Sequence, residues 1–376
     1  MEAPFRKARD LVLVSAGVGL DGGGTAVVAR LLANVAAGYC AERGIRFQVM
    51  DLGRSSRILG GVPVRHYSGS QIRLALAVWQ AQLFGAGTRL IFDCIGPSRV
   101  QGLMPMNIGS PYALYLHGWE VWRKLSCDRR RALRSAAIRL ANSLFTIAKA
   151  RDCNPWLPQA ALLPLALEDR APDEELDQRL GKSLGEGYLL IVGRMSRLER
   201  YKGHDELLGA MPRVAAACPS AKLVVAGDGD DRERLARDAT ALGLAERVTF
   251  TGFVSEATLG ELYRRCAALV MPSRNEGFGL VYLEAMRAGR PCLALRRSAA
   301  EEIIVDGTTG ILVEPGDQEQ LVAALVRLLS DAAMARRLGE AGRRRYEAMF
   351  TFKNFRAGLL PHLDRLLGLE GTDARA

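Results

Sequence analysis

Patterns that would bind a metal ion or form disulfide bonds are missing from this sequence. Its seven cysteines are scattered, odd in number and never spaced as C-x-x-C, which argues against a zinc site and a disulfide framework. The chain has no low-complexity tract and no continuous apolar run of the roughly 18 residues that a membrane helix needs. With 49% hydrophobic and 24% charged residues, it is predicted to be a folded cytoplasmic protein with reduced thiols.

The 376 residues are too many for one ordinary hydrophobic core and suit two α/β domains. Apolar segments alternate with amphipathic ones, which is typical of parallel sheets covered by helices on both faces. The predicted strands are residues 11–15, 47–52, 90–94, 112–117 and 144–148, then 188–193, 222–226, 247–251, 268–271 and 291–295. Helices are expected between them, including one from about residue 25 and a basic one over 128–141, and the predicted link is 163–187.

Positive charge is concentrated in the N-terminal part of the chain. Residues 1–165 contain 21 Lys and Arg against 9 Asp and Glu, a net charge of +12, whereas the remainder contains 30 against 32, a net charge of −2. All four tryptophans lie in the same part. A basic surface attracts phosphates, anionic lipid or nucleic acid, but no nucleic-acid-binding module is recognisable, so nucleic acid is not an expected partner. The predicted basic helix holds Arg130, Arg131 and Arg134, and it would either dock on an anionic membrane or form an ordinary solvated face.

A glycine-rich loop follows the first predicted strand. Residues 17–22 read G-V-G-L-D-G and match the dinucleotide-binding fingerprint G-x-G-x-x-G. An NAD-dependent dehydrogenase is nevertheless disfavoured, because no acidic residue follows at the usual distance and Asp51 lies further on. Gly23 and Gly24 let a ligand approach the backbone at a helix start that presents free N–H groups to an anion. For this loop, a tight turn without any ligand is an equally good interpretation.

The strongest functional pattern is residues 275–286, N-E-G-F-G-L-V-Y-L-E-A-M. The predicted helix is apolar on nearly every side except at Glu284, a carboxylate that is costly to bury without hydrogen bonds. Two neighbouring ribose hydroxyls would supply them; otherwise Glu284 occupies a narrow solvent-exposed stripe. Gly277 and Gly279 expose N–H donors at the positive end of the helix dipole, which suits a phosphate. Glu276 precedes them in a loop after a strand, where α/β proteins present ligand-binding groups.

Two basic residues belong to a second pattern upstream. Arg194 follows Gly193 at the carboxyl end of a predicted strand, and Lys202 lies just before the next predicted helix. A guanidinium fork grips phosphate oxygens, and an ammonium adds a mobile point charge. Together they could neutralise a diphosphate without a metal ion, or they could be ordinary solvated cations.

Five motifs occur in the order and spacing of glycosyltransferase family 4, a family of retaining enzymes. They are G-R-x7-K-G from Gly193, A-G-D-G at 226–229, F-T-G-F-V at 250–254, P-S at 272–273 and E-x7-E from Glu276 to Glu284. The chain resembles this family densely over residues 187–350 and more loosely before them. After Leu295 it departs from the family, which usually has a glycine-rich turn before a glutamate. Here the sequence reads R-R-S-A-A-E-E, which puts phosphate contacts from this turn in doubt.

The resemblance implies an α/β fold of GT-B architecture, in which two Rossmann-like doubly wound domains face each other across a cleft. The expected domains are 1–170 for the acceptor and 171–350 for the nucleotide sugar, and a helix within 351–376 is expected to return to the first domain. By resemblance, the donor contacts are Arg194 and Lys202 for the diphosphate, Glu284 for the ribose, Glu276 for the sugar, the backbone of Gly277, Phe278, Gly279 and Leu280 for sugar and phosphate, and Phe253 and Val254 for the base. Gly193, Gly23 and Gly24 complete the expected donor-binding set.

His117 is the expected site residue of the first domain. It lies at the end of a predicted strand and precedes a glycine. In the family, a histidine at this place approaches the donor sugar from across the cleft; the alternative is a hydrogen-bonded histidine beneath a loop. Asp21 in the glycine loop is a candidate acceptor contact.

The resemblance also implies an activity. A hexose would move, with retention of configuration, from a UDP- or GDP-linked sugar to a lipid-linked or polysaccharide-precursor acceptor, as in polysaccharide biosynthesis. Arg194, Lys202, Glu276 and His117 would be the catalytic residues, and neither a metal ion nor another cofactor is expected. A nucleotide-sugar epimerase of the same fold is the alternative. The expected location is the cytoplasm, with peripheral contact to the cytoplasmic face of an anionic membrane.

Overall fold

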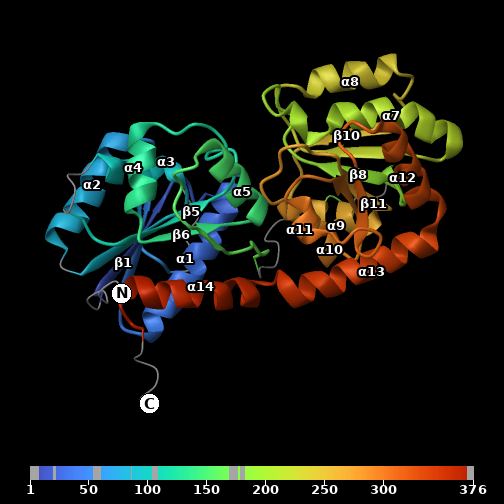
Figure 1. Cartoon of the computed structure of the whole chain (residues 1–376). Coiled ribbons are helices and arrows are strands. Elements are labelled where there is room, and N and C mark those ends of the chain that lie inside the picture. The colour runs from blue at the N-terminus through green and yellow to red at the C-terminus, as the bar shows by residue number, and fades with distance from the viewer. Residues whose placement is uncertain are drawn as a thin grey trace. The chain divides into compact units, whose positions relative to one another are not determined.

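The structure is a computed structural model that describes residues 8–19, 23–53, 61–85, 87–103, 109–168, 177 and 183–370. The chain divides into two compact units, which are Met1–Glu168 with Phe352–Ala376, and Asp169–Thr351. Each unit contains one parallel sheet (Figure 1). The fold is therefore two Rossmann-like α/β units, as expected.

The sheet of the first unit has seven strands in the order β3-β2-β1-β4-β5-β6-β7. They are β1 (Asp10–Ser15), β2 (Arg46–Asp51), β3 (Val64–His66), β4 (Thr88–Phe92), β5 (Tyr112–Leu116), β6 (Ile138–Ala141) and β7 (Ala161–Leu162). Strands β1, β4 and β5 have apolar centres and are almost wholly buried, as is typical of central parallel strands. The strand order reverses between β1 and β4, which is where doubly wound sheets bind ligands.

Helices cover both faces of this sheet. Figure 1 shows α1 (Gly24–Glu42) beside α14 (Phe352–Leu367) on one face, whereas α2 (Gln71–Phe84), α3 (Ile95–Gly102) and α4 (Cys127–Ser135) gather on the other. This division follows from right-handed crossovers, because the chain moves outward from β1 to β3 and then returns through β4 to β7. Helix α14 is fastened to the unit, since Nε of Arg89 donates to the carbonyl of Leu366 at 3.1 Å and Ala8 N–H donates to the carbonyl of Leu367 at 2.9 Å.

Helix α1 is long and apolar enough to cross a membrane, contrary to the expectation that no segment would be. Within the unit, 61% of its 18-residue window is buried. It also carries the buried Arg30, whose Nε lies 2.6 Å from a carboxylate oxygen of Glu168. These features are those of a core helix that packs on β1 and β2.

The second unit has a six-stranded sheet in the order β10-β9-β8-β11-β12-β13. Its strands are β8 (Leu189–Val192), β9 (Leu223–Ala226), β10 (Val248–Gly252), β11 (Ala268–Met271), β12 (Cys292–Leu295) and β13 (Gly310–Val313). Its helices are η1 (Arg200–Lys202), α7 (His204–Ala217), α8 (Arg232–Ala241), α9 (Glu256–Arg265), α10 (Leu280–Arg287), α11 (Ala300–Ile303), α12 (Gln318–Ser330) and α13 (Ala332–Met349). The strand order reverses between β8 and β11.

Two glycines bring the loops at the carboxyl edge of this sheet into backbone contact. Gly227 has φ +129°, and a Cβ there would lie 2.2 Å from the carbonyl oxygen of Gly193. Gly203 has φ +91°, and a Cβ there would lie 2.6 Å from Cγ of Pro272. Because only glycine fits at both positions, the loops after β8, β9 and β11 form one close-packed edge.

The expected strand at residues 144–148 is wrong, because Leu144–Cys153 form helix α5. Ser143 starts this helix, since its Oγ accepts a hydrogen bond from Thr146 N–H at 3.0 Å. The basic helix is also shorter than predicted. It ends where Ala136 turns extended (ψ 130°), and Ile138–Ala141 then pair with β5 as strand β6. The predicted helix was too long because arginines recur at helix-like spacing from α4 to Arg139, which belongs to strand β6.

Candidate functional site

The carboxyl ends of β8 and β11 form the switch point of the second unit, where ligands bind in open α/β sheets. The loop after β8 carries Arg194, and the residues after β11 include Glu276. Because β8 and β11 are neighbours, the chain brings these two predicted residues to one edge of the sheet. Lys202 joins them, since Cδ of its side chain would lie 3.5 Å from a Cβ placed on Gly193.

Arg194 and Lys202 share one carboxylate, that of Glu199. Arg194 donates to it from Nε at 3.0 Å and from Nη2 at 2.7 Å, and Nζ of Lys202 lies 3.6 Å away. Burial raises the pKa of Glu199, but the hydrogen bond from Arg194 and the nearby Lys202 more than offset this, so the pKa lies below its usual range. Glu199 thus holds two cations together at the switch point. Sequence reasoning missed it, although its position three residues before Lys202 was a usable signal.

Glu276 is half-buried beside these cations. Burial raises its pKa, whereas the charge of Lys202 and a hydrogen bond from the Gly277 backbone act in the opposite direction. The next element, α10, starts after Gly279, whose φ of +94° is natural for glycine and whose Cβ would lie 2.4 Å from the Tyr282 ring. Neither a capping side chain nor an acidic residue occupies the first turn of α10. Tyr282 N–H donates to the Gly279 carbonyl at 3.0 Å, which leaves the N–H groups of Leu280 and Val281 available to an anion.

The side chains on either side of Gly279 have different roles. Phe278 is buried and packs edge-on against Phe350, with ring centroids 6.2 Å apart. Leu280, the first residue of α10, is half-buried. A ligand would therefore meet the backbone at Phe278, as the resemblance implies, since its side chain is committed to the core.

Glu284 lies one turn into α10 and is half-buried. The Tyr263 hydroxyl donates to its Oε2 at 2.5 Å, and burial raises the pKa of the carboxyl group. Glu284 shares its side of α10 with half-buried Leu280 and exposed Arg287, so this environment is compatible with both the ribose and the stripe interpretations. Tyr263, on α9, was missed by sequence reasoning, because nothing in the sequence links it to Glu284.

The other predicted donor contacts lie at the same edge of the sheet. Phe253 follows β10 directly and is 80% exposed, an unusual state for a large aromatic side chain; Val254 beside it is half-buried. Two buried polar atoms near the loops lack a hydrogen-bond partner among the described residues, Nε2 of His204 and Oγ of Ser273. Unsatisfied buried groups of this kind favour a polar ligand or water close by.

The turn that departs from the family pattern is held by ion pairs. Arg296 pairs with Asp306 and lies 3.6 Å from Glu314, and Arg297 lies 3.2 Å from the same Glu314 carboxylate. Arg297 has φ +57°, a left-handed conformation that glycine adopts without strain. The arginines thus occupy a turn whose backbone suits the glycine-rich sequence of the family, and their charges are already compensated.

In the first unit, His117 follows β5 and is half-buried. Its Nε2 lies 2.6 Å from the carbonyl oxygen of Asp93, and because a carbonyl only accepts, this nitrogen carries the hydrogen. Asp93 itself is buried and accepts from Oγ of Ser15 at 2.6 Å, and burial raises its pKa to about 6. Asp93 was not predicted, although a polar residue directly after a buried strand was the available signal.

The structure describes residues 17–19 and 23–24 of the glycine loop. Gly23 and Gly24 are exposed, no side chain caps α1 at Gly23, and nothing lies within 4 Å of a Cβ placed on Gly23. The loop is fastened by buried Asp51, which accepts from Val18 N–H at 3.1 Å and lies 3.1 Å from Nδ1 of His66. Asp51 is thus already engaged, which further disfavours a role as a ribose-binding acid. Asp21 lies outside the described residues.

Among the described residues, no group of three or more His, Cys, Asp or Glu side chains is arranged to hold a metal ion. The seven cysteines are free thiols, and burial raises the pKa of Cys40 to about 12.

The second unit can be compared with known proteins on this basis. Residues 172–345 match the family described as glycosyl transferases group 1. This segment of the chain belongs to that family. The matched segment contains Arg194, Glu199, Lys202, Glu276 and Glu284.

The most similar relatives include the GDP-mannose-dependent alpha-(1-6)-phosphatidylinositol monomannoside mannosyltransferase of Mycolicibacterium smegmatis, 35% identical over 60% of this chain and 63% of the relative. A Mycobacterium tuberculosis glycogen synthase is 34% identical over 45% of this chain and 40% of its own length. The chain therefore spans less than two thirds of these curated relatives in each alignment.

Solved structures with the same fold cover nearly the whole chain. The sucrose-phosphate synthase of Thermosynechococcus elongatus has a TM-score of 0.77 at 22% identity and covers 96% of this chain and 100% of its own. The Anabaena protein HepE, solved with UDP and glucose, has a TM-score of 0.76 at 19% identity. The match covers 94% of this chain and 99% of the HepE chain. At this identity the likeness shows the fold, which is that of GT-B glycosyltransferases.

Proposed function

We propose that the protein is a retaining glycosyltransferase that moves a hexose from a nucleotide-diphosphate sugar to a lipid-linked or saccharide acceptor. The observation that carries the proposal is the switch-point cluster of the second unit. There Arg194 and Lys202 share Glu199, Glu276 lies beside them, and α10 starts with uncapped N–H groups. This combination suits a sugar diphosphate, because it offers cations for phosphate and carboxylates for hydroxyls.

The chemistry is a substitution at the anomeric carbon. The bond between that carbon and the diphosphate oxygen breaks, a bond to the acceptor oxygen forms, and the acceptor proton goes to the leaving phosphate. Arg194, Lys202 and the α10 N-terminus would stabilise the charge that develops on the diphosphate. Glu276 would lie near the cationic sugar carbon, Glu284 would hold the ribose, and the exposed Phe253 would meet the base with Val254. The roles of His117 toward the sugar and of Gly23 and Gly24 toward the phosphate remain predictions.

The names of the relatives suggest which donors to try first. The Mycolicibacterium smegmatis mannosyltransferase is GDP-mannose-dependent by name, and HepE was solved with UDP and glucose. We therefore propose GDP-mannose as the first candidate donor and UDP-glucose as the second.

The test is transfer by the purified full chain. The protein is incubated with each donor and with lipid extract or an oligosaccharide, in EDTA, and products are identified by mass and by the anomeric coupling constant in NMR spectra. A hexose-bearing product with the donor's anomeric configuration is expected. Inversion of configuration would refute the retaining mechanism. Conversion of the donor to its epimer without any acceptor would favour the nucleotide-sugar epimerase instead.

We also propose that the first unit docks peripherally on anionic membrane, where a lipid-linked acceptor would reside. Helix α2 supports this, because Ile72, Leu76 and Leu83 lie along one side of it and are 75%, 57% and 55% exposed. Its opposite side packs inward through Leu74 and Val78. The helix contains one charged residue, an arginine, and no acidic one. An exposed apolar stripe without negative charge fits a bilayer surface.

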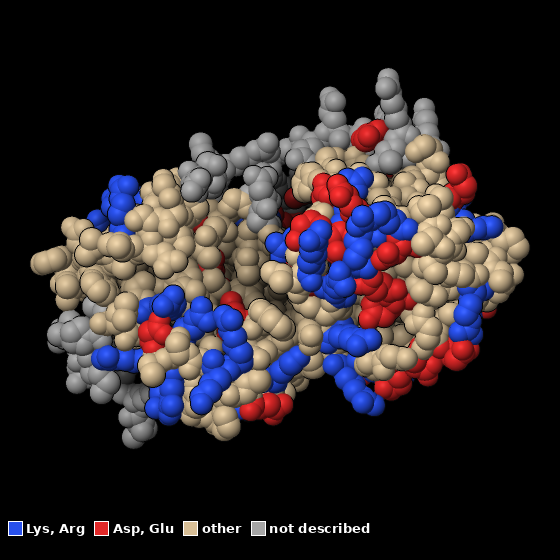
Figure 2. All heavy atoms as spheres, turned by 90° about the horizontal axis from the view of Figure 1, so that it is seen from above, with Lys and Arg blue, Asp and Glu red and all other residues tan. Residues whose placement is uncertain are grey.

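Basic side chains lie on the same face of the sheet as α2 (Figure 1). Helix α3 contacts both α2 and α4, and the guanidinium groups of Arg130 and Arg134 on α4 lie 4.9 and 5.3 Å from the Trp156 ring centre. Figure 2 shows that the upper face of this unit is largely uncharged and is bordered mainly by Lys and Arg. Apolar contact combined with positive charge favours anionic over neutral lipid.

Liposome co-sedimentation tests the docking. Leu76→Gln with Leu83→Gln should weaken binding to anionic vesicles, and so should Arg130→Glu with Arg134→Glu. Only the arginine replacements should make vesicle binding less dependent on salt, because the attraction between surface charges is screened at high salt. Leu242→Gln, an exposed leucine of the second unit, is the matched control. Equal partitioning of the wild type to neutral and anionic vesicles would contradict the proposal.

A further inference from the structure

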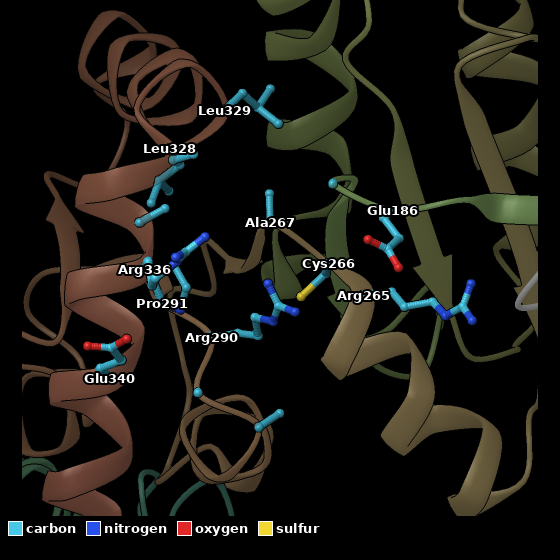
Figure 3. A pocket seen from close by; sticks show the side chains of 15 residues that line it. Glu186, Arg265, Cys266, Ala267, Arg290, Pro291, Leu328, Leu329, Arg336 and Glu340 are labelled. Carbon is cyan, nitrogen blue, oxygen red and sulfur yellow. The ribbon is translucent and has the colours of Figure 1, made fainter.

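The second unit contains a cavity of about 610 Å³ at the amino ends of its strands. Its walls include residues that lie one or two positions before three strands: Gly187 before β8, Ala267 before β11 and Pro291 before β12. The end of α12 and the start of α13 close the other side (Figure 3). Because the strands are parallel, this cavity lies at the opposite edge of the sheet from Arg194 and Glu276, and it belongs to no site described above.

The charges around the cavity are unevenly compensated. Arg265 pairs with Glu261, and its guanidinium turns away from the central space in Figure 3. Arg290 and Arg336 point into that space. Arg290 bonds a backbone carbonyl, that of Arg264, and neither Arg290 nor Arg336 forms an ion pair with a carboxylate within the described part of the chain. Two uncompensated guanidinium groups facing one cavity favour an anionic ligand.

The other residues that line the cavity indicate which class of ligand it would bind. Glu186 and Glu340 contribute carboxylates, which accept hydrogen bonds from hydroxyl groups, and Leu328 and Pro291 supply apolar surface. The volume falls within the range of small-molecule sites, roughly 300–1,000 Å³. Guanidinium groups for a phosphate and carboxylates for hydroxyls match a phosphate monoester of a polyhydroxy compound, such as a sugar phosphate.

We propose that this cavity is an effector site for a small hydroxyl-bearing phosphate monoester, and that its occupancy changes nucleotide affinity at the switch-point cluster. Helix α10 connects the two places. Its N-terminus follows Glu276 and Gly279, whereas the residues after its C-terminus, Ala288–Arg290, line the cavity. The coupling half of this proposal rests on the proposed nucleotide site, but the binding half does not.

The packing of α13 shows how a ligand would act on α10. Gly339 on α13 lies so close to the turn after α10 that a Cβ would come within 2.1 Å of the Gly289 carbonyl oxygen. A Cβ on Gly342 would lie 3.3 Å from Cγ of Met286. Because the two helices are in backbone contact next to the cavity, a ligand that draws Arg336 toward Arg290 must move α10 with α13.

Hydrogen exchange with mass spectrometry tests binding on the full chain, with ribose 5-phosphate, inorganic phosphate and ribose as probes. Ribose 5-phosphate should slow exchange in residues 288–291 and 332–340. Inorganic phosphate should act more weakly and ribose least. Arg336→Ala should abolish the protection, whereas Arg337→Ala, an exposed arginine on the same helix that does not line the cavity, should keep it. Protection that is absent, or equal in Arg336→Ala, would overturn the proposal.

Isothermal titration then tests the coupling. Ribose 5-phosphate should change the affinity for UDP or GDP about fivefold or more, and the change should vanish in Arg336→Ala but persist in Arg337→Ala. A change that persists in Arg336→Ala would mean competition at the switch-point cluster and would refute an effector site. Protection of the cavity without any change in nucleotide affinity would refute it as well. If neither nucleotide binds at all, the proposed donor site fails, while exchange in residues 288–291 still reports on the cavity.

Discussion

Replacing Glu284 by Gln separates a ribose-binding carboxylate from a structural one. Tyr263 uses Oε2 of this carboxylate, and a carboxylate accepts about four hydrogen bonds, so two ribose hydroxyls have room to bind. A hydrogen bond to a charged group is worth about 2 kcal/mol, against about 1 kcal/mol for a neutral pair. Losing the charge across two such bonds should cost about 2 kcal/mol, or roughly 30-fold in nucleotide affinity.

Folding should be affected far less. The side-chain carbonyl of glutamine still accepts from the Tyr263 hydroxyl, and neutralising a group whose pKa is raised by burial removes an unfavourable buried charge. We therefore expect the unfolding free energy of Glu284→Gln to stay within about 1 kcal/mol of the wild type.

The assay is isothermal titration with UDP, GDP and their 2′-deoxy forms. In the wild type, removing the 2′-hydroxyl should weaken binding about 30-fold, since one charge-assisted hydrogen bond of about 2 kcal/mol is lost. In Glu284→Gln this difference between ribose and deoxyribose should shrink to about fivefold, since the lost hydrogen bond is a neutral one of about 1 kcal/mol. Tyr263→Phe, which keeps the carboxylate, is the control and should preserve most of the difference. An unchanged deoxyribose penalty in Glu284→Gln would refute the ribose assignment.

Four shorter predictions concern the second unit. Arg194→Ala or Lys202→Ala should each lower kcat about 10²-fold in transfer assays while circular dichroism remains native, because each removes a charge that stabilises the leaving diphosphate. Near-wild-type rates in both variants would rule out these two residues as the diphosphate contacts. Transfer should continue in EDTA, and a complete loss that Mg²⁺ or Mn²⁺ restores would contradict cation-only stabilisation. Arg297→Gly should stabilise the unit by about 1 kcal/mol in urea unfolding, because it relieves a left-handed backbone; a destabilised variant would show that the ion pair to Glu314 dominates. Burial lowers the pKa of His204 from its ordinary 6.5 to about 4, so the stability that neutral His204 provides should be full above pH 6.5 and fall as the pH drops toward 4. His204→Gln should flatten this pH dependence, and an unchanged slope would assign the dependence to other groups.

Much of the second unit was predictable from the sequence because its strands are short apolar runs that are buried on both faces. Ala268–Met271 is an example, and its predicted bounds match the structure. The residues that meet at the switch point were predictable for a related reason, since they follow such strands or lie at the start of the next helix. Glu276 and Gly279 after β11 are cases in point.

The remaining features depend on contacts between distant segments or on ambiguous local patterns. The pairing of Tyr263 with Glu284 joins two helices, and no local pattern specifies it. The segment beginning at Leu144 is a short apolar run whose periodicity fits strand and helix alike. The hydrogen bond from Thr146 N–H to Oγ of Ser143 caps a helix here. A serine at this position is a helix-start signal that the sequence contains.

Ligand-dependent thermal unfolding tests the central claim most directly. The full chain is scanned with GDP-mannose, UDP-glucose and NAD⁺, and any transitions of the two units are fitted separately. One nucleotide sugar, at about 100 times its Kd, should stabilise the second unit by about 2.7 kcal/mol, and the shift should be lost when Arg194 and Lys202 are both replaced by alanine. Stabilisation by NAD⁺ alone, or a nucleotide-sugar shift that survives the double replacement, would contradict a donor site at the switch point.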